Sequence, residues 1–216
     1  MSAAGTIPAA RVERRRLPVP LLLFIASLVL YVGAALYSGQ LNQLNASGVI
    51  GLLQRMVGLG IVALGQTFVI LAGSIDLSVA NLISVAAVMA SFVMQGDPGM
   101  IVPAILLVLA ISVAVGAANG LIVAKLGVNP LIATLGVGLI LQGLLSASFN
   151  NFAGSVPEAF QGLAYGAIGG LPWSVLGLFA LALVGAFVLR STRFGAHLYA
   201  TGGNPDGARL AGIRTD

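Results

Sequence analysis

The sequence has no cysteine and very little charge. Without cysteine, its 216 residues can form neither a disulfide nor a thiolate metal site. Only 7% of the residues are charged, whereas a soluble globular protein carries about 25%. So little charge cannot cover a surface that faces water, and 58% of the residues are hydrophobic. The composition therefore predicts an integral membrane protein set in a lipid bilayer. It also excludes a basic face for nucleic acid, despite a formal net charge of +4.

The groups that most enzymes use are scarce too. The single histidine, His197, has no serine or cysteine placed to build a triad with it, and no phosphate-binding G-x-x-x-x-G-K-[ST] stretch occurs. Residues 58–63 fit a G-x-G-x-x-A fingerprint, but they lie inside an apolar run with no strand before them. We therefore expect no catalytic residues, no metal site and no cofactor in this chain.

Long uncharged runs set the expected topology. Residues 17–37 have the length of one membrane span, about 20 residues. Residues 57–96 contain one charge, and as a single helix they would run about 60 Å, twice the hydrocarbon core. They should therefore fold into two spans that reverse at residues 76–77. Further spans are expected at residues 100–124, 131–149 and 171–189. The sequence thus predicts an all-α, polytopic membrane protein with about six transmembrane helices.

The placement of the charges predicts an orientation. Basic residues cluster before the first span and at two later span ends that the count puts on the same side, while acidic residues fall opposite. The positive-inside rule then places the N-terminus in the cytoplasm. Arg55, near the outer end of the second span, is the exception. The basic positions are Arg11, Arg14, Arg15, Arg16, Lys125, Arg190 and Arg193, and the acidic ones are Asp97 and Glu158.

Asp76 is the one charged residue between Arg55 and Asp97. In one interpretation it belongs to a capped turn near a membrane face, where Gly73 ends one helix and Asp76 or Ser78 begins the next. That position avoids the roughly 2.5–3.5 kcal/mol that a charge costs in the middle of a bilayer. In the other, Asp76 is a partly buried carboxylate in a broken helix that lines a pathway. The sequence leaves both open.

Neutral polar side chains recur along the spans. They can hydrogen-bond between helices, or they can line a path for an uncharged, hydroxyl-rich solute. Because no charged group other than Asp76 is a candidate for the bilayer interior, we expect a partner to supply the energy of any transport. A self-sufficient secondary transporter, the rival hypothesis, would need Asp76 as its ion-binding acid. The candidates for the path are Gln66, Asn81, Asn119, Thr134 and Gln142.

Three stretches carry a family resemblance: GIVALGQTFVILAGSIDLSVANL (60–82), NGLIVAKLGVNPLIATLGVGLILQGL (119–144) and TRFGAHLYATGGNPDGARLAGI (192–213). Together they resemble the permease subunits of ABC importers for monosaccharides, of the ribose/xylose/galactose type. The departures are Ser74 and Ala80 where glycines are usual, Leu131 where phenylalanine is common, and Ala196 where a basic residue is usual.

The resemblance implies the N-terminal part of an ABC type-2-like permease domain in a bacterial inner membrane. Its partners would be ATPase (nucleotide-binding) subunits, an extracytoplasmic solute-binding protein that meets the loop at 150–170, and a second permease copy. The expected organisation is a cytoplasmic tail (1–16), a six-span permease domain (17–190) and a cytoplasmic loop that docks the ATPase (191–216). Gly73, Asp76 and Ser78 would form the family's signature segment. Coupling to the ATPase would fall to Gly202, Gly203, Asn204, Arg209 and Gly212, with a sharp turn at 202–205 before a short helix at 206–213.

Members of that family continue with several more spans beyond this loop. We therefore expect the chain to be truncated at its C-terminus, and a split permease or a non-transporting fragment is the alternative hypothesis. Hydroxyl-binding side chains do not identify which sugar or other solute is carried.

Overall fold

A computed structural model describes residues 18–149 and 154–215. The predicted tail at residues 1–16 and the start of the predicted 150–170 loop lie outside the described residues. The chain divides into two compact units, Met1–Val49 and Ile50–Asp216.

The first unit contains the apolar helix α1 (Val19–Tyr37) and a short 3-10 helix, η1 (Leu41–Leu44). Pro18 precedes α1 and fixes an extended entry at the helix start. The Tyr31 hydroxyl donates a 2.9 Å hydrogen bond to the Gln43 carbonyl, so η1 is tied back to α1. In its described part, α1 matches the first predicted span.

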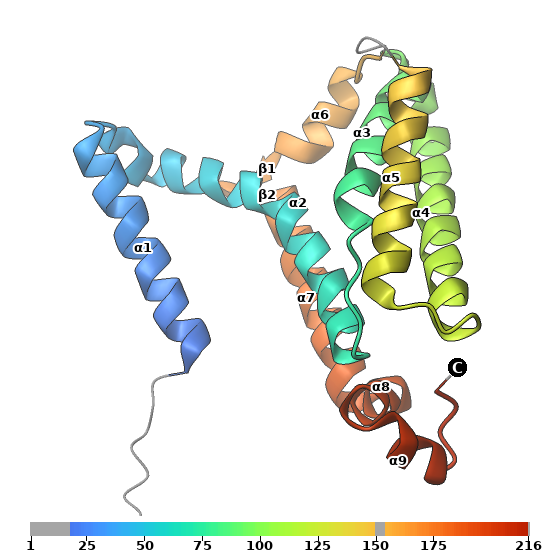
Figure 1. Ribbon diagram of the computed structural model, residues 1–216. Helices are drawn as coiled ribbons and strands as arrows, with labels where there is room; N and C mark the ends of the chain where they lie inside the picture. The colour runs from blue at the N-terminus through green and yellow to red at the C-terminus, as the bar shows by residue number, and fades with distance from the viewer. Residues whose placement is uncertain (1–17, 150–153, 216) are drawn as a thin grey trace, which may run out of the picture. The chain divides into compact units, whose positions relative to one another are not determined.

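The second unit is built around three helices that lie side by side, α3 (Val79–Met94), α4 (Ile101–Ala124) and α5 (Pro130–Ser148) (Figure 1). Small side chains suit this packing, and Ala104 of α4 and Ala133 of α5 are buried. Gly138 has the same effect, because a Cβ at that position would lie 3.3 Å from the Ser78 Cα. Asn129 starts α5 by accepting a 2.9 Å hydrogen bond from the Leu131 N–H.

Helices α2 (Ala46–Leu71) and α7 (Trp173–Ser191) contact each other through glycines. A Cβ at Gly60 would press on the Leu178 side chain, and one at Gly185 would meet the Phe68 ring at 3.6 Å. In each contact, a glycine of one helix leaves room for a large side chain of the other.

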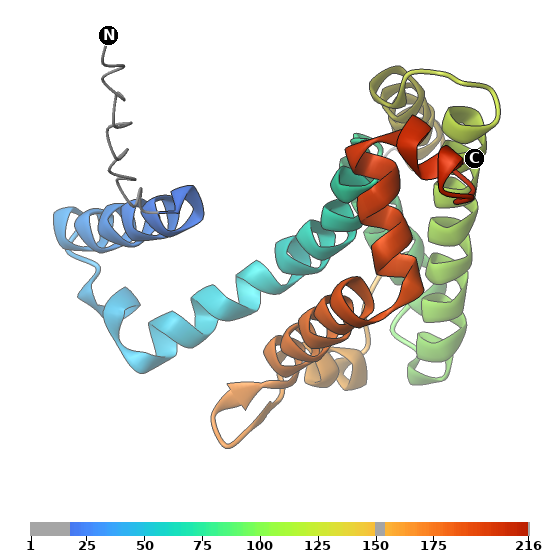
Figure 2. The ribbon, with the colours of Figure 1, turned by 90° about the horizontal axis from the view of Figure 1, so that it is seen from below.

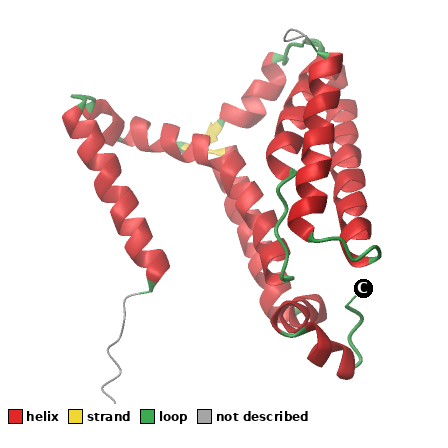
Figure 3. Cartoon of the chain, viewed as in Figure 1, coloured by secondary structure: helices red, strands yellow, loops and turns green. Residues whose placement is uncertain are grey.

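The prediction of an all-α polytopic membrane protein is confirmed. Within the described residues, α1, α2, α4, α5 and α7 are long and apolar enough to cross a membrane. Helix α3 is also apolar, but its 16 residues reach only about 24 Å. The expected third span is short because residues 74–77 run up to α3 as an extended loop (Figure 3). Four extended residues add about 13 Å to the length of α3.

The predicted loop before the last span carries structure of its own. It holds helix α6 (Glu158–Tyr165) and strand β1 (Ala167–Ile168), which pairs antiparallel with β2 (Leu171–Pro172) at the predicted start of the last span. The two residues between the strands, Gly169 and Gly170, have φ values of 57° and 85°. Positive φ at both positions is what a tight hairpin turn requires, and glycine adopts it without strain.

After α7 come α8 (Arg193–Gly203) and α9 (Pro205–Leu210), which Figure 2 shows beside the end of α2. The sequence did not predict α8, and the expected sharp turn at 202–205 is wrong in its first half. Gly202 and Gly203 are the last residues of α8, and only Asn204 breaks the helical path before Pro205. The helix expected at 206–213 begins one residue earlier, at Pro205, and ends three residues earlier, at Leu210, shortly before Gly212 takes φ 79°.

Candidate functional site

The chain between α2 and α3 is the centre of the candidate site. Helix α2 ends in a Schellman motif, in which the Gly73 N–H donates to the Ile70 carbonyl (2.9 Å) and the Ser74 N–H to the Val69 carbonyl (3.0 Å). Gly73 has φ 81°, as a residue at that position of the motif requires. The reversal therefore falls at residues 72–73. The predicted reversal at 76–77 is wrong, since Asp76 lies beyond the turn in an extended segment.

Replacing Gly73 with alanine should lower the free energy of unfolding by about 1–2 kcal/mol, because a Cβ is strained at positive φ. Gly65→Ala is the matched control. Gly65 lies inside α2 with open space around it, so alanine there should be neutral or stabilising by up to about 1 kcal/mol. Thermal unfolding of the two variants in detergent measures the difference. Equal melting temperatures would contradict the Schellman motif.

Asp76 organises a polar cluster at the start of α3. Its Oδ1 accepts hydrogen bonds from the Ser78 N–H (2.8 Å) and from the Ser78 hydroxyl (2.6 Å). The Asn119 amide, from α4, donates to the Ser78 Oγ at 2.9 Å and lies 3.5 Å from Asp76 Oδ2. Ser78 is fully buried and Asn119 is 5% exposed. Within the part of the chain that the structure describes, the buried Asn119 Oδ1 has no hydrogen-bond partner. The cluster thus joins the extended segment to α4.

Thr134, near the start of α5, holds the same segment from the other side. Its Oγ accepts a 3.0 Å hydrogen bond from the Leu77 N–H and donates a 2.8 Å bond to the Pro130 carbonyl of its own helix. Thr134 is 3% exposed, so these bonds are shielded from water. The extended residues before α3 thereby gain the partners that a regular helix would have supplied within itself.

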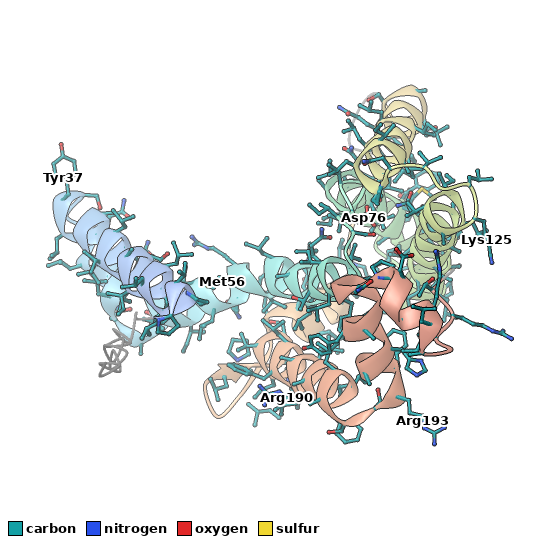
Figure 4. The ribbon with its side chains drawn as sticks, turned by 60° about the horizontal axis from the view of Figure 1, so that its bottom comes forward. Tyr37, Met56, Asp76, Lys125, Arg190 and Arg193 are labelled. Atoms are coloured by element: carbon teal, nitrogen blue, oxygen red, sulfur yellow. The ribbon has the colours of Figure 1, made fainter. Side chains whose placement is uncertain are left out.

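Asp76, Asn119 and Thr134 line one cavity of about 560 Å³. Asp76 is half-buried and lies where the α3–α5 bundle meets α8 and α9 (Figure 4). This favours the second interpretation of Asp76, a partly buried carboxylate in a broken helix that lines a pathway, although its Oδ1 also accepts from the N–H of Ser78, the residue just before α3. The other polar residues of the wall are Ser74, Thr201, Arg209 and Thr215.

Helix α8 contacts the end of α2 without any intervening side chain. A Cβ at Gly202 would overlap the Leu71 carbonyl oxygen and lie 3.1 Å from the Ala72 carbonyl carbon. A Cβ at Gly73 would lie 3.6 Å from the Gly202 Cα. The segment predicted to couple to an ATPase therefore touches the predicted signature segment. Because this contact leaves no free space, α8 could not move closer to α2 without displacing residues 71–73.

The remaining predicted residues lie apart from the cavity wall. Gln66 is half-buried in α2, and Gln142 is exposed on α5. Asn81 faces α5, since its Nδ2 would be 3.2 Å from a Cβ at Gly138. Gly203 has open space around it, and Asn204 caps α9 by accepting from the Gly207 N–H at 2.9 Å.

Sequence reasoning missed four residues that shape the site: Ser74, Gly138, Thr201 and Thr215. A local signal for α8 was present, because Thr192 accepts from the Gly195 N–H as a helix N-cap. With α8 placed, Thr201 would fall near its C-terminus. No local pattern marks Gly138, whose importance comes from the helix opposite it.

Comparison with known proteins decides the family. Residues 48–216 match the family described as branched-chain amino acid transport system / permease component. The chain belongs to this family. This permease is 40% identical over 163 residues to the inner membrane ABC transporter permease protein YjfF of Escherichia coli (strain K12), covering 73% of this chain and 49% of the relative.

Two further relatives are import permeases by name. The galactose/methyl galactoside import permease protein MglC of Escherichia coli (strain K12) is 35% identical over 194 residues, 80% of this chain and 56% of the relative. The ribose import permease protein RbsC of the same strain is 32% identical over 180 residues, 81% of this chain and 56% of the relative. This permease thus spans about half the length of the curated relatives it matches. No solved structure gives a significant match.

Proposed function

We propose that this chain is a membrane-spanning permease subunit of an ATP-driven ABC importer, which carries a monosaccharide or a similar neutral polar solute into the cytoplasm. Two of its relatives are named for galactose and ribose import. The cavity supports such a solute, because its wall combines hydroxyl and amide groups with apolar side chains. Such groups both donate to and accept from a sugar hydroxyl.

The contact of Gly202 with Leu71 and Ala72 is the observation that carries the proposal. In our scheme, ATPase subunits in the cytoplasm bind α9 and displace it. Helix α8 transmits the displacement through its closely packed end to residues 71–73, and from there to Asp76 in the cavity wall. The backbone contact suits this task, because no flexible side chain lies between the parts to absorb the motion.

The same scheme predicts how the chain is oriented in the membrane and which other proteins it binds. The N-terminus and the α8–α9 end would face the cytoplasm of a bacterial cell, which agrees with Arg190 and Arg193 beside the start of α8. Helix α6 and the hairpin after it would then face outward, where a solute-binding protein delivers its cargo. A second permease copy would complete the path. The alternatives are one part of a split permease and a fragment that does not transport.

Co-purification with the nucleotide-binding subunit encoded beside this gene tests the proposal. Leu210, in α9, is 92% exposed, and an apolar side chain so placed is suited to a partner's groove. Leu210→Asp should weaken binding about tenfold or more, because the buried contact would then enclose a charge. Leu163→Asp is the matched control, since Leu163 is 60% exposed in α6 and should leave binding unchanged.

Equal binding by wild type and Leu210→Asp would reject α9 as the docking element. Equal loss in both variants would mean that the substitutions disturb insertion instead of the contact. If properly inserted wild type does not bind at all, the fragment hypothesis becomes the better one.

A further inference from the structure

Two opposite charges line the cavity from different walls. Asp76 lies on the segment held by α4 and α5, and Arg209 belongs to α9. Among the described residues that line the cavity, these are the charged ones. The sequence suggested Arg209 as a contact for the ATPase, and the structure places it among the residues that line the same cavity as Asp76.

The present contacts of Arg209 are easily exchanged. Its Nη1 lies 3.6 Å from Asp206 Oδ1, and the two side chains are 62% and 90% exposed. An ion pair so exposed contributes little, because water and salt screen it. The Arg209 Nε also donates a 2.6 Å hydrogen bond to the Thr215 hydroxyl. Both partners belong to the same short stretch as Arg209, so neither ties α9 to the bundle.

Asp76 has an oxygen left to accept such a donor. Its Oδ1 already takes two hydrogen bonds from Ser78, but the one contact of Oδ2 within the described residues is the 3.5 Å approach of the Asn119 amide. A carboxylate oxygen accepts about two hydrogen bonds. A guanidinium reaching Oδ2 would leave the Ser78 bonds intact and would add a charge-assisted bond in a partly dehydrated site.

We propose that Asp76 and Arg209 form an ion pair that draws α9 onto the bundle and closes this cavity during the transport cycle. The proposal rests on the proposed function for its place in that cycle, but the closure itself is a property of this chain. It also gives the carboxylate at position 76 a role beyond the helix start. Arg209 is then a positioning residue for the closed state.

The absence of cysteine permits a clean measurement of closure. Val123→Cys and Thr201→Cys place the chain's two thiols on the α4 and α8 walls of the cavity. The rate at which a short bifunctional thiol reagent links them in membranes reports how often the walls approach. No ATPase or solute is added, so the outcome does not depend on whether the chain transports.

In this background, Arg209→Gln and Asp76→Asn should each slow cross-linking about fivefold. The double variant should be no slower than either single variant, because the same interaction is lost. Asp76→Asn keeps an oxygen for Ser78, so the cluster stays folded. Arg214→Gln is the matched control, since Arg214 is exposed and does not line the cavity. Added salt should slow cross-linking in the protein that carries only the two cysteine substitutions, and it should leave the cross-linking rate of the Arg209→Gln variant unchanged.

Two results would overturn the ion pair. In one, Arg209→Gln and Arg214→Gln cross-link at the same rate. In the other, the effects of Asp76→Asn and Arg209→Gln multiply, which means that the two side chains act independently. Either result would leave the docking of α9 on an ATPase untouched, because that test reads binding through Leu210.

Discussion

Gly202→Ala should dislodge α8 from the end of α2 and lower the free energy of unfolding by about 1–3 kcal/mol. The added Cβ would overlap the Leu71 carbonyl oxygen, which is backbone and cannot rotate away as a side chain could. Relief therefore requires α8 to move as a whole. Chemical denaturation in detergent measures the loss, and protease cleavage between α7 and α9 should become faster.

Gly203→Ala provides the control for this experiment. Gly203 is the next residue of the same helix end, and a Cβ there would meet no atom of the described residues within 4 Å. It should unfold like the wild type or be slightly more stable, since alanine favours a helix over glycine. A similar loss in both variants would show that flexibility at the end of α8, and not contact with α2, is what the glycines supply.

Asp76→Leu should have the largest effect on stability, a loss of about 2–5 kcal/mol. Leucine removes the acceptor of the Ser78 N–H and of the Ser78 hydroxyl, and Ser78 is fully buried. A buried donor without a partner costs its full desolvation energy, about 1–3 kcal/mol each. Thermal unfolding in detergent measures the loss. Hydrogen exchange should also show that the backbone amides of α3 become less protected.

Two further variants separate this explanation from a general effect of charge. Asp76→Asn keeps one oxygen for Ser78 and should cost about 1 kcal/mol or less. Asp206→Leu removes a carboxylate that is 90% exposed and should cause no measurable change. If Asp76→Asn were as damaging as Asp76→Leu, the negative charge itself would hold the segment in place, and the hydrogen bonds to Ser78 would be secondary.

The sequence alone was sufficient to predict the features that depend on composition or on residues that are neighbours in the chain. Scarce charge and long apolar runs predicted a polytopic membrane protein, because the bilayer acts on every span in the same way. Gly73 was recognised as a helix end for a local reason, since the Schellman motif needs positive φ within one turn. The family resemblance likewise rested on contiguous stretches of residues.

Only the tertiary structure decided where the chain reverses and what surrounds Asp76. Residues 74–77 form an extended loop because distant residues hold its end. Thr134, 57 residues from Leu77 in the chain, accepts from the Leu77 N–H, and Asn119, 41 residues from Ser78, donates to the Ser78 hydroxyl. The midpoint of an apolar run carries no information about such distant partners. The role of Gly202 also depends on a residue that is distant in the chain. Its importance arises from the carbonyl of Leu71, and a contact between residues so far apart in the chain is fixed by packing and not by local sequence.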